Sequence, residues 1–296
     1  IDDSRINAFA MPGGYFGVHS GLITASRTES ELGAVIAHEL SHVTQRHIAE
    51  RIAAAQGTNL RTAAMVLAGL LISAQNPQAG MAAATSGMAS GIDAQLAYSR
   101  EHEREADRHG MRILANASLN PQGMADFFTV LNDDSRYRRT PPPFLSTHPL
   151  TEARIADARA IANQLKPETP FESPDYTYIR ARTQVIGADS LNDVLAAFQA
   201  RMASSPSSGE RYGLALALIQ TGDPERGVEH LNALRETNGE NALLHLGLAE
   251  AALAQGNIQT AIARLEQGLS LFPDQPALRY AQVEAYLQAG ANAKAV

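Results

Sequence analysis

The sequence predicts a mainly α-helical protein in which an α+β domain with one small β-hairpin precedes an all-α solenoid of repeats. Short segments of strand character come first, and long stretches with helical spacing of apolar residues follow them. A proline-rich stretch without apolar periodicity then spans residues 166–176. After it, similar side chains recur at a constant interval. We therefore expect two domains, residues 1–166 and 177–296.

The first domain is expected to begin with the hairpin, as two strands around the turn "PGG" in residues 5–23. The capping box of Thr28 and Glu31 begins a helix that keeps its apolar spacing as far as Ile52. Three consecutive prolines make "RYRRTPPPFLSTHP", residues 136–149, an irregular connector. Further helices are expected at about 60–74, 93–115, 121–132 and 151–165.

Residues 62–92 contain no charged side chain. Their continuous apolar part ends at "QNPQ", short of the ~20 residues that a membrane span needs, so we expect no span here. A buried Ala/Leu helix followed by a Gly/Met-rich loop explains this composition. The alternative is a mobile cover, or an apolar contact surface for unfolded chains or for the membrane periphery.

After residue 177 the chain repeats itself every 34 residues, the period typical of tetratricopeptide (TPR) repeats. The segment "GNIQTAIARLEQGLSLFPDQP" has their small-residue, large-residue and terminal-proline order at Ala261, Leu265 and Pro273. A helical bundle with coincidental spacing is the alternative, and a fainter repeat is expected at 178–209. The recurring residues are Tyr212, Leu246 and Tyr280 and the glycines Gly222, Gly256 and Gly290.

Length and composition limit the number of domains, the kinds of partner and the kinds of metal site that the chain can have. Its 296 residues suffice for two domains with a core each. A net charge of -7 without a long Lys/Arg run argues against a nucleic acid partner. Because the chain has no cysteine, any metal site must use histidines and carboxylates. The first residues lack the basic and apolar regions of a signal peptide, which we expect to lie outside this sequence.

The stretch "AVIAHELSHVTQRH", residues 34–47, places polar residues in an apolar helix. Four residues turn a helix by about 400°, so His38 and His42 point the same way and can bind one metal ion. Glu39 lies about 100° from His38, where a base for the attacking water would stand. The alternative is two histidines that only pack. His47 lies about 180° from His38, and we expect it at the surface or between helices.

The second helix of interest, "SREHEREADRHG", supplies carboxylates. Glu103 and Asp107 are four residues apart and therefore share one face, as a metal ligand and an acid that accepts the N–H of a ligand imidazole. The carboxylates Glu101 and Glu105 remain alternative ligands, and solvent is expected around His102 and His109. A longer zinc motif, H-E-x-x-H-x-x-G-x-x-H, is excluded by Gln45 and Ile48.

Four segments in this order, "NAFAMPGG", "HELSH", "EREAD" and "STHP", resemble the HtpX-type zinc metallopeptidases, and with the repeats the resemblance covers nearly the whole chain. The resemblance implies a zincin-like domain with one Zn2+ per chain on His38, His42 and Glu103. It also implies Glu39 as catalytic base and Asp107 as supporting acid. HtpX itself has membrane spans, which this chain lacks, so membrane insertion does not carry over.

His148, in the loop "STHP", has three interpretations. It is a surface turn residue, or it hydrogen-bonds the oxyanion together with Arg154, or it binds zinc as a fourth, inhibitory ligand. A zinc ion with four protein ligands leaves no place for water, so the last interpretation describes a latent enzyme.

The resemblance to HtpX-type metallopeptidases with TPR repeats implies a periplasmic zinc endopeptidase that degrades misfolded or stalled envelope and outer-membrane proteins. Its repeats would dock to the outer-membrane assembly machinery, and chaperone activity would accompany cleavage. The alternative is a TPR chaperone or adaptor with a latent or mainly structural zinc site. The presence of Glu39 favours the enzyme, since a structural site has no need of a base.

Overall fold

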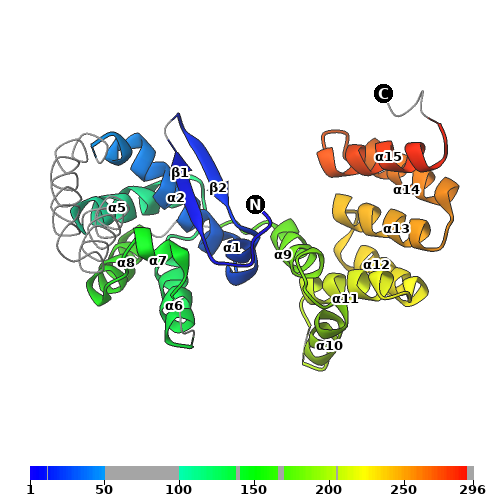
Figure 1. Cartoon of the computed structure of the whole chain (residues 1–296), viewed down its shortest axis with the longest axis horizontal. Coiled ribbons are helices and arrows are strands. Elements are labelled where there is room, and N and C mark those ends of the chain that lie inside the picture. The colour runs from blue at the N-terminus through cyan, green and yellow to red at the C-terminus, as the bar shows by residue number, and fades with distance from the viewer. Residues whose placement is uncertain (12, 51–99, 138–140, 166–169, 205, 292–296) are drawn as a thin grey trace, which may run out of the picture. The chain divides into compact units, whose positions relative to one another are not determined.

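The structure is a computed structural model that describes residues 1–11, 13–50, 100–137, 141–165, 170–204 and 206–291 (Figure 1). It separates into two compact units, Ile1–Glu172 and Ser173–Val296. Helices dominate both units, and the described residues contain one two-stranded sheet, which confirms the predicted fold class. The expected helix at 60–74 and the apolar segment 62–92 lie outside the described residues.

The hairpin of the first unit consists of β1 (Ala8–Met11) and β2 (Tyr15–Val18), paired antiparallel with Ala8 opposite Val18. It is shorter than predicted, because helix α1 (Ser20–Ala25) begins inside the expected second strand. The amino-terminal segment explains the difference: the backbone N–H of Ser20 donates to the carbonyl of Ile1. That donor is therefore not available to continue the strand ladder.

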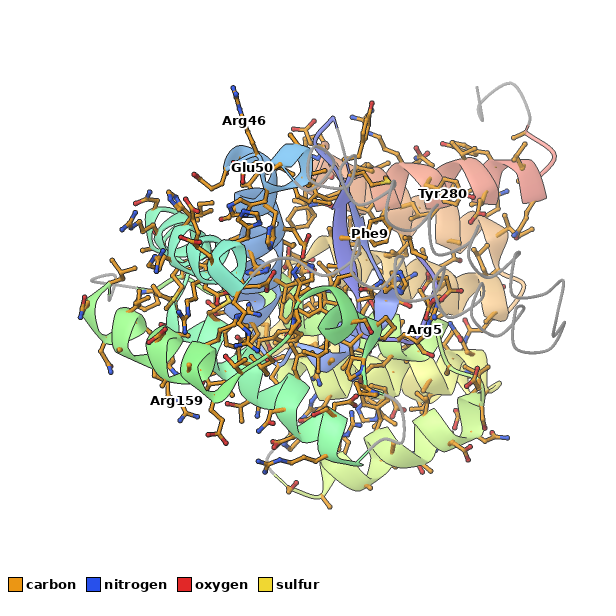
Figure 2. All side chains as sticks on the ribbon, turned by 60° about the vertical axis from the view of Figure 1, so that its left-hand side comes forward. Arg5, Phe9, Arg46, Glu50, Arg159 and Tyr280 are labelled. Carbon is orange, nitrogen blue, oxygen red and sulfur yellow. The ribbon has the colours of Figure 1, made fainter. Side chains whose placement is uncertain are left out.

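Helix α2 (Glu29–Thr44) begins as predicted, because the Thr28 side chain accepts a hydrogen bond from the backbone N–H of Glu31. The prediction that it continues to Ile52 was wrong. Arg46 adopts φ 63°, in the left-handed region, which interrupts the helix before a new helical turn at residues 47–50. The side chain of Arg46 points into solvent (Figure 2), so the turn leaves no charge buried.

Four further helices complete the described part of the first unit. Helix α2 packs on α5 and α6, and α8 packs on the same two helices. The core between them includes Leu22, Val35, Met111, Leu114, Phe127 and Leu131. The helices are α5 (Arg100–Asn116), α6 (Gln122–Tyr137), α7 (Pro143–Thr147) and α8 (Glu152–Gln164).

The boundaries of these helices test the sequence predictions. Helix α8 confirms the helix at 151–165, with Thr151 as its N-cap. Helix α6 runs beyond its predicted end at residue 132. The connector at 136–149 is not wholly irregular either, because Pro143 lies in the first turn of α7, where a helix has no use for the missing N–H.

The second unit consists of helices that recur with the predicted period. Helices α9, α11, α13 and α15 each begin 34 residues after the one before, which confirms the repeats and includes the fainter one. The recurring glycines Gly222, Gly256 and Gly290 have φ of 94°, 74° and 71°, which residues with a Cβ rarely adopt. The helices are α9 (Pro174–Ile186), α10 (Leu191–Met202), α11 (Ser208–Gln220), α12 (Pro224–Asn238), α13 (Ala242–Ala254), α14 (Ile258–Leu271) and α15 (Pro276–Gln288). Among the described helices, none has both the length and the apolar character of a membrane span.

Candidate metal centre

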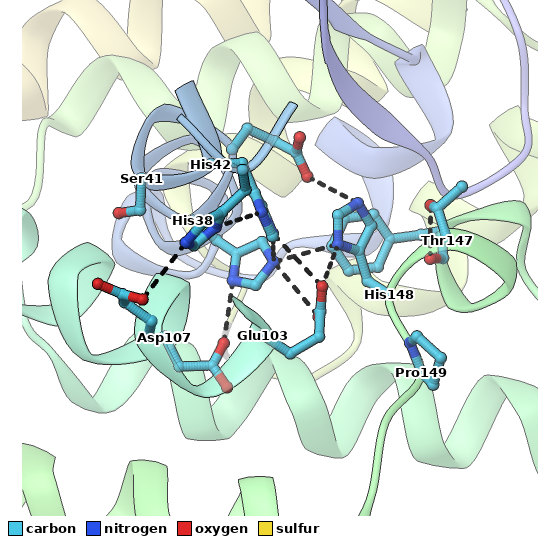
Figure 3. Close-up of polar contacts among 12 residues, drawn as sticks. His38, Ser41, His42, Glu103, Asp107, Thr147, His148 and Pro149 are labelled. Carbon is cyan, nitrogen blue, oxygen red and sulfur yellow. Dashed lines mark hydrogen bonds and ion pairs between the residues drawn. The ribbon is translucent and has the colours of Figure 1, made fainter. Parts of the chain in front are cut away.

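Three helices bring four potential metal-binding side chains together in the first unit (Figure 3). His38 and His42 come from α2, and Glu103 comes from α5. His148 follows the last residue of α7 and caps that helix. All four side chains are buried, and one donor atom from each lies within 4.8 Å of the other three. The structure therefore brings these predicted residues to one point.

The distances between the donor atoms fit a zinc ion. Nε2 of His38 lies 3.0 Å from Nε2 of His42 and 3.2 Å from Nδ1 of His148. Oε1 of Glu103 lies 3.4 Å from Nε2 of His42 and 3.1 Å from Nδ1 of His148. Zinc bonds to nitrogen and oxygen of about 2.0–2.1 Å in a tetrahedron place ligand atoms about 3.3–3.4 Å apart. Imidazoles with a carboxylate are also donors that zinc accepts.

The charges in the site suit a cation. Burial lowers the pKa of His42 to about 2, which keeps its ring neutral and its lone pair available. Burial acts against ionisation of Glu103 as well, but hydrogen bonds with His148 and His42 outweigh it and lower the pKa of this carboxyl. A neutral imidazole and an ionised carboxylate are the protonation states that bind a metal.

Asp107 and Arg154 support this cluster from one side. Oδ1 of Asp107 lies 2.9 Å from Nδ1 of His38. The Arg154 guanidinium donates to both oxygens of Asp107, from Nε at 2.7 Å and from Nη2 at 2.8 Å. Its Nη1 lies 2.6 Å from Oε2 of Glu103 and donates to the carbonyl of Pro149. Arg154 is buried and thus joins the carboxylates of α5 to the loop that carries His148.

These contacts also explain two opposite pKa shifts. Burial disfavours the charged forms of both His38 and Asp107. For His38, the hydrogen bond to Asp107 and the charge of Glu103 outweigh burial and raise the pKa. For Asp107, hydrogen bonds from His38 and Arg154 outweigh burial and lower the pKa. The pair therefore holds Nδ1 of His38 as the protonated nitrogen and leaves Nε2 facing the other donor atoms.

Glu39 stands beside the cluster, with only 2% of its surface exposed. Its Oε1 lies 3.2 Å from Nε2 of His148, and it also accepts a backbone hydrogen bond from Ala10 of β1. Burial raises the pKa of Glu39, against the opposing charges of His148 and His38. The site thus contains a buried carboxylate that is separate from the four clustered donors.

Comparison with known proteins agrees with this geometry. The model of peptidase family M48 matches residues 1–162. The chain belongs to peptidase family M48. Two tetratricopeptide repeat models match residues 212–263 and 252–296 of this M48 member.

Some relatives match nearly the whole chain, and others match about half of it. The beta-barrel assembly-enhancing protease of Yersinia pestis is 34% identical over 299 residues, which cover 100% of this chain and 62% of that protein. Its counterpart from Escherichia coli (strain K12) is 36% identical over 294 residues, or 98% of this chain and 60% of that protein. The E. coli metalloprotease LoiP is 31% identical over 52% of this chain and 58% of its own length. The chain thus spans about three fifths of the length of these relatives.

We expected His47 at the surface or between helices, opposite His38 on a continuous helix. It lies between helices, buried against His102 and Glu105 of α5, but on the side of His42, with Nδ1 3.0 Å from Nδ1 of His42. The break at Arg46 turns the chain, so the helical angle calculated from sequence spacing does not apply. Gln45 and Arg46, which precede His47, are both good helix formers, so the sequence carries no signal for this break.

The remaining acids and histidines of α5 lie outside the cluster of four donors. Glu101 is exposed, while Glu105 lies 3.4 Å from Nε2 of His47. His102 is not simply in solvent, because its ring stacks on that of His47 and its Nε2 lies 3.0 Å from Glu50. His109 faces Gln45, with 3.4 Å between nitrogens. Of Glu101, Glu103 and Glu105, Glu103 is the one that joins the cluster of potential metal ligands.

Proposed function

We propose that the chain is a zinc-dependent endopeptidase that binds one Zn2+ through His38, His42 and Glu103. The observation that carries this proposal is the tetrahedral spacing of buried donors next to the separate buried carboxylate of Glu39. A purely structural zinc site requires no such acid. Membership of peptidase family M48 supports the same activity.

The residues around the site have distinct tasks in this mechanism. Zinc, when bound, supplies a Lewis acid that activates water and polarises the carbonyl of the peptide bond. Glu39 accepts the proton of the attacking water and passes it to the leaving amine. Burial raises the pKa of Glu39 and so makes its carboxylate a stronger base. Asp107 and Arg154 keep His38 and Glu103 oriented through hydrogen bonds.

Metal removal tests the activity directly. The purified full chain should contain about one zinc ion and should cleave an unfolded casein-type substrate. A chelator should abolish cleavage, and added Zn2+ should restore it, because Glu39 alone cannot activate water sufficiently. Metal content is measured by atomic emission beside the cleavage assay. Cleavage that survives complete removal of the metal contradicts the proposal.

We further propose that the described arrangement is a resting state held by His148. Its Nδ1 lies among the donor atoms, and its Nε2 lies 3.2 Å from the carboxylate of Glu39. His148 would take the fourth position around a zinc ion bound here, and it contacts the proposed base Glu39. The stacked ring of Phe144, 4.6 Å away, steadies it there. Activity then requires α7 to carry His148 away.

His148→Ala is expected to raise basal cleavage of an unfolded substrate or of the enzyme itself. Removing this imidazole frees the fourth position and the Glu39 carboxylate together, while three zinc ligands remain. Initial rates at equal zinc content measure the effect, with Thr147→Ala as the control on the same helix. The oxyanion interpretation predicts the opposite, a loss of rate on the order of 10²-fold. Such a loss with zinc still bound would reject the resting state.

Strand β1 is the proposed binding edge for substrate. It pairs with β2 on one side, and its residue Ala10 contacts the carboxylate of Glu39. An extended peptide added to the other edge would form main-chain hydrogen bonds beside the base. Such binding selects unfolded segments rather than a strict sequence. We therefore propose misfolded or stalled envelope and outer-membrane proteins as substrates, in keeping with relatives named beta-barrel assembly-enhancing proteases.

The repeats are the proposed docking surface for the outer-membrane assembly machinery in the periplasm. Stacked TPR helices present extended surfaces to protein partners, and chaperone activity could reside there. A variant limited to residues 1–172 should still cleave a short unfolded peptide but should not retain assembly partners in a pull-down. If it retains them as well as the full chain does, docking does not depend on the repeats.

A further inference from the structure

We propose that His47 is a positioning residue for the zinc ligand His42. It accepts the Nδ1–H of His42 and so holds the ring with Nε2 toward the metal. This inference rests on the zinc site proposed above and adds to it a residue beyond the HELSH motif. Its support is a short series of contacts that runs from His42 to His47 and on to His102 and Glu105.

The first contact determines the direction of the hydrogen bond. Nε2 of His42 faces the other donor atoms, 3.0 Å from Nε2 of His38 and 3.4 Å from Oε1 of Glu103. A neutral imidazole that binds a metal through Nε2 carries its hydrogen on Nδ1. That nitrogen lies 3.0 Å from Nδ1 of His47. His42 therefore donates, and Nδ1 of His47 accepts.

The surroundings of His47 favour the tautomer that this requires. With Nδ1 as acceptor, the hydrogen of His47 lies on Nε2, and that nitrogen is 3.4 Å from the carboxylate of Glu105. The ring of His102 stacks on His47 with centroids 4.3 Å apart and an interplanar angle of 15°. His102 is in turn held by Glu50, 3.0 Å from its Nε2. The ring of His47 is thus oriented from two directions.

His47 is the counterpart of Asp107. Asp107 accepts from His38 on one side of the site, and His47 accepts from His42 on the other. The Asp107 carboxylate has its charge balanced by the buried guanidinium of Arg154. A second buried carboxylate beside His42 would lack such a partner among the contacts described here. A neutral imidazole supplies the acceptor without adding a buried charge.

The backbone explains how His47 reaches this position. On a continuous helix it would face away from His38 by about 180°. The left-handed backbone of Arg46 interrupts the helix. The next helical turn then brings His47 back against His42. The interruption of α2 therefore has a structural consequence at the metal site.

A matched pair of variants tests the role of the acceptor. His47→Asn keeps an oxygen near the place of Nδ1, whereas His47→Leu has a similar size and no acceptor. The Leu variant should bind Zn2+ roughly 10–100-fold more weakly, the usual loss for a missing partner of a ligand histidine. The Asn variant should stay within a few-fold of the unmodified chain. Competition with a chromophoric chelator measures both affinities.

A spectroscopic measurement separates positioning from packing. In the zinc-loaded chain labelled with 15N-histidine, the Nδ1–H of His42 should give a slowly exchanging proton signal. His47→Asn should preserve this signal, and His47→Leu should lose it or accelerate its exchange. If the Leu variant does not fold, His47→Ala takes its place. Equal affinities of the Asn and Leu variants, whether both normal or both weak, overturn the inference.

His42→Ala distinguishes failure of this inference from failure of the zinc site. If His42→Ala loses zinc while both His47 variants bind it normally, the site stands and the positioning role is wrong. If His42→Ala binds zinc like the unmodified chain, His42 is no ligand and the proposed site itself is wrong.

Discussion

Glu39→Gln is expected to abolish cleavage of an unfolded substrate while zinc remains bound. Glutamine has nearly the same shape as glutamate, but its amide cannot take the proton from the attacking water. The three proposed ligands are unchanged, so the metal should stay at about one per chain. The turnover rate should fall about 10²–10⁴-fold, the range for loss of a general base. Steady-state cleavage and metal analysis of the same preparation measure both quantities.

Glu101→Gln is the matched control for this substitution. It removes an exposed carboxylate of α5 that lies outside the donor cluster, and its rate should equal that of the unmodified chain. Loss of zinc from Glu39→Gln would indicate that Glu39 binds the metal. Retention of full activity with zinc bound would require another base.

His38→Ala and Glu103→Ala are expected to weaken zinc binding itself, each by more than roughly 100-fold. Loss of an outer partner of a ligand typically costs about 10–100-fold in affinity, and loss of a ligand should cost more. Each substitution removes one of the four clustered donors. Zinc dissociation constants from chelator competition provide the measurement, and cleavage should disappear in parallel.

Glu101→Ala serves as the control for Glu103→Ala, since the two acids lie two residues apart on one helix. Only the buried one faces the histidines. If both His38→Ala and Glu103→Ala bind zinc with unchanged affinity, the metal lies elsewhere. A loss for only one of them would keep the cluster but remove the other residue from the ligand set.

Local spacing was enough to predict several features of this chain. The interval of four between His38 and His42 places both rings on one helix face, and the structure agrees. The period of 34 residues predicted the helix pairs of the second unit. Each repeat folds as a local unit, and successive repeats resemble one another. Residue type alone did not identify the carboxylate that binds the metal, since Glu101, Glu103 and Glu105 are equally acidic. The resemblance to a family singled out Glu103.

The prediction of an uninterrupted helix as far as Ile52 was wrong, because the helix breaks at residues 45–46. His47 was placed opposite His38, but the left-handed Arg46 redirects the chain and buries His47 beside His42. Arg154 was expected to bind the oxyanion or to support the site, and its nitrogens contact Asp107, Glu103 and the carbonyl of Pro149. A single backbone angle and the packing of three helices decide these positions.

The helical fold, the repeat period and the candidate metal ligands on α2 therefore follow from the amino-acid sequence alone. These features depend on spacing along one helix or one repeat, which is set by local backbone geometry. The grouping of His148 with His38, His42 and Glu103, and the contact of His47 with His42, depend on the tertiary structure. His148 lies 110 residues from His38 in sequence. Contacts over such separations arise from how helices pack, and no local pattern of residues encodes that packing directly.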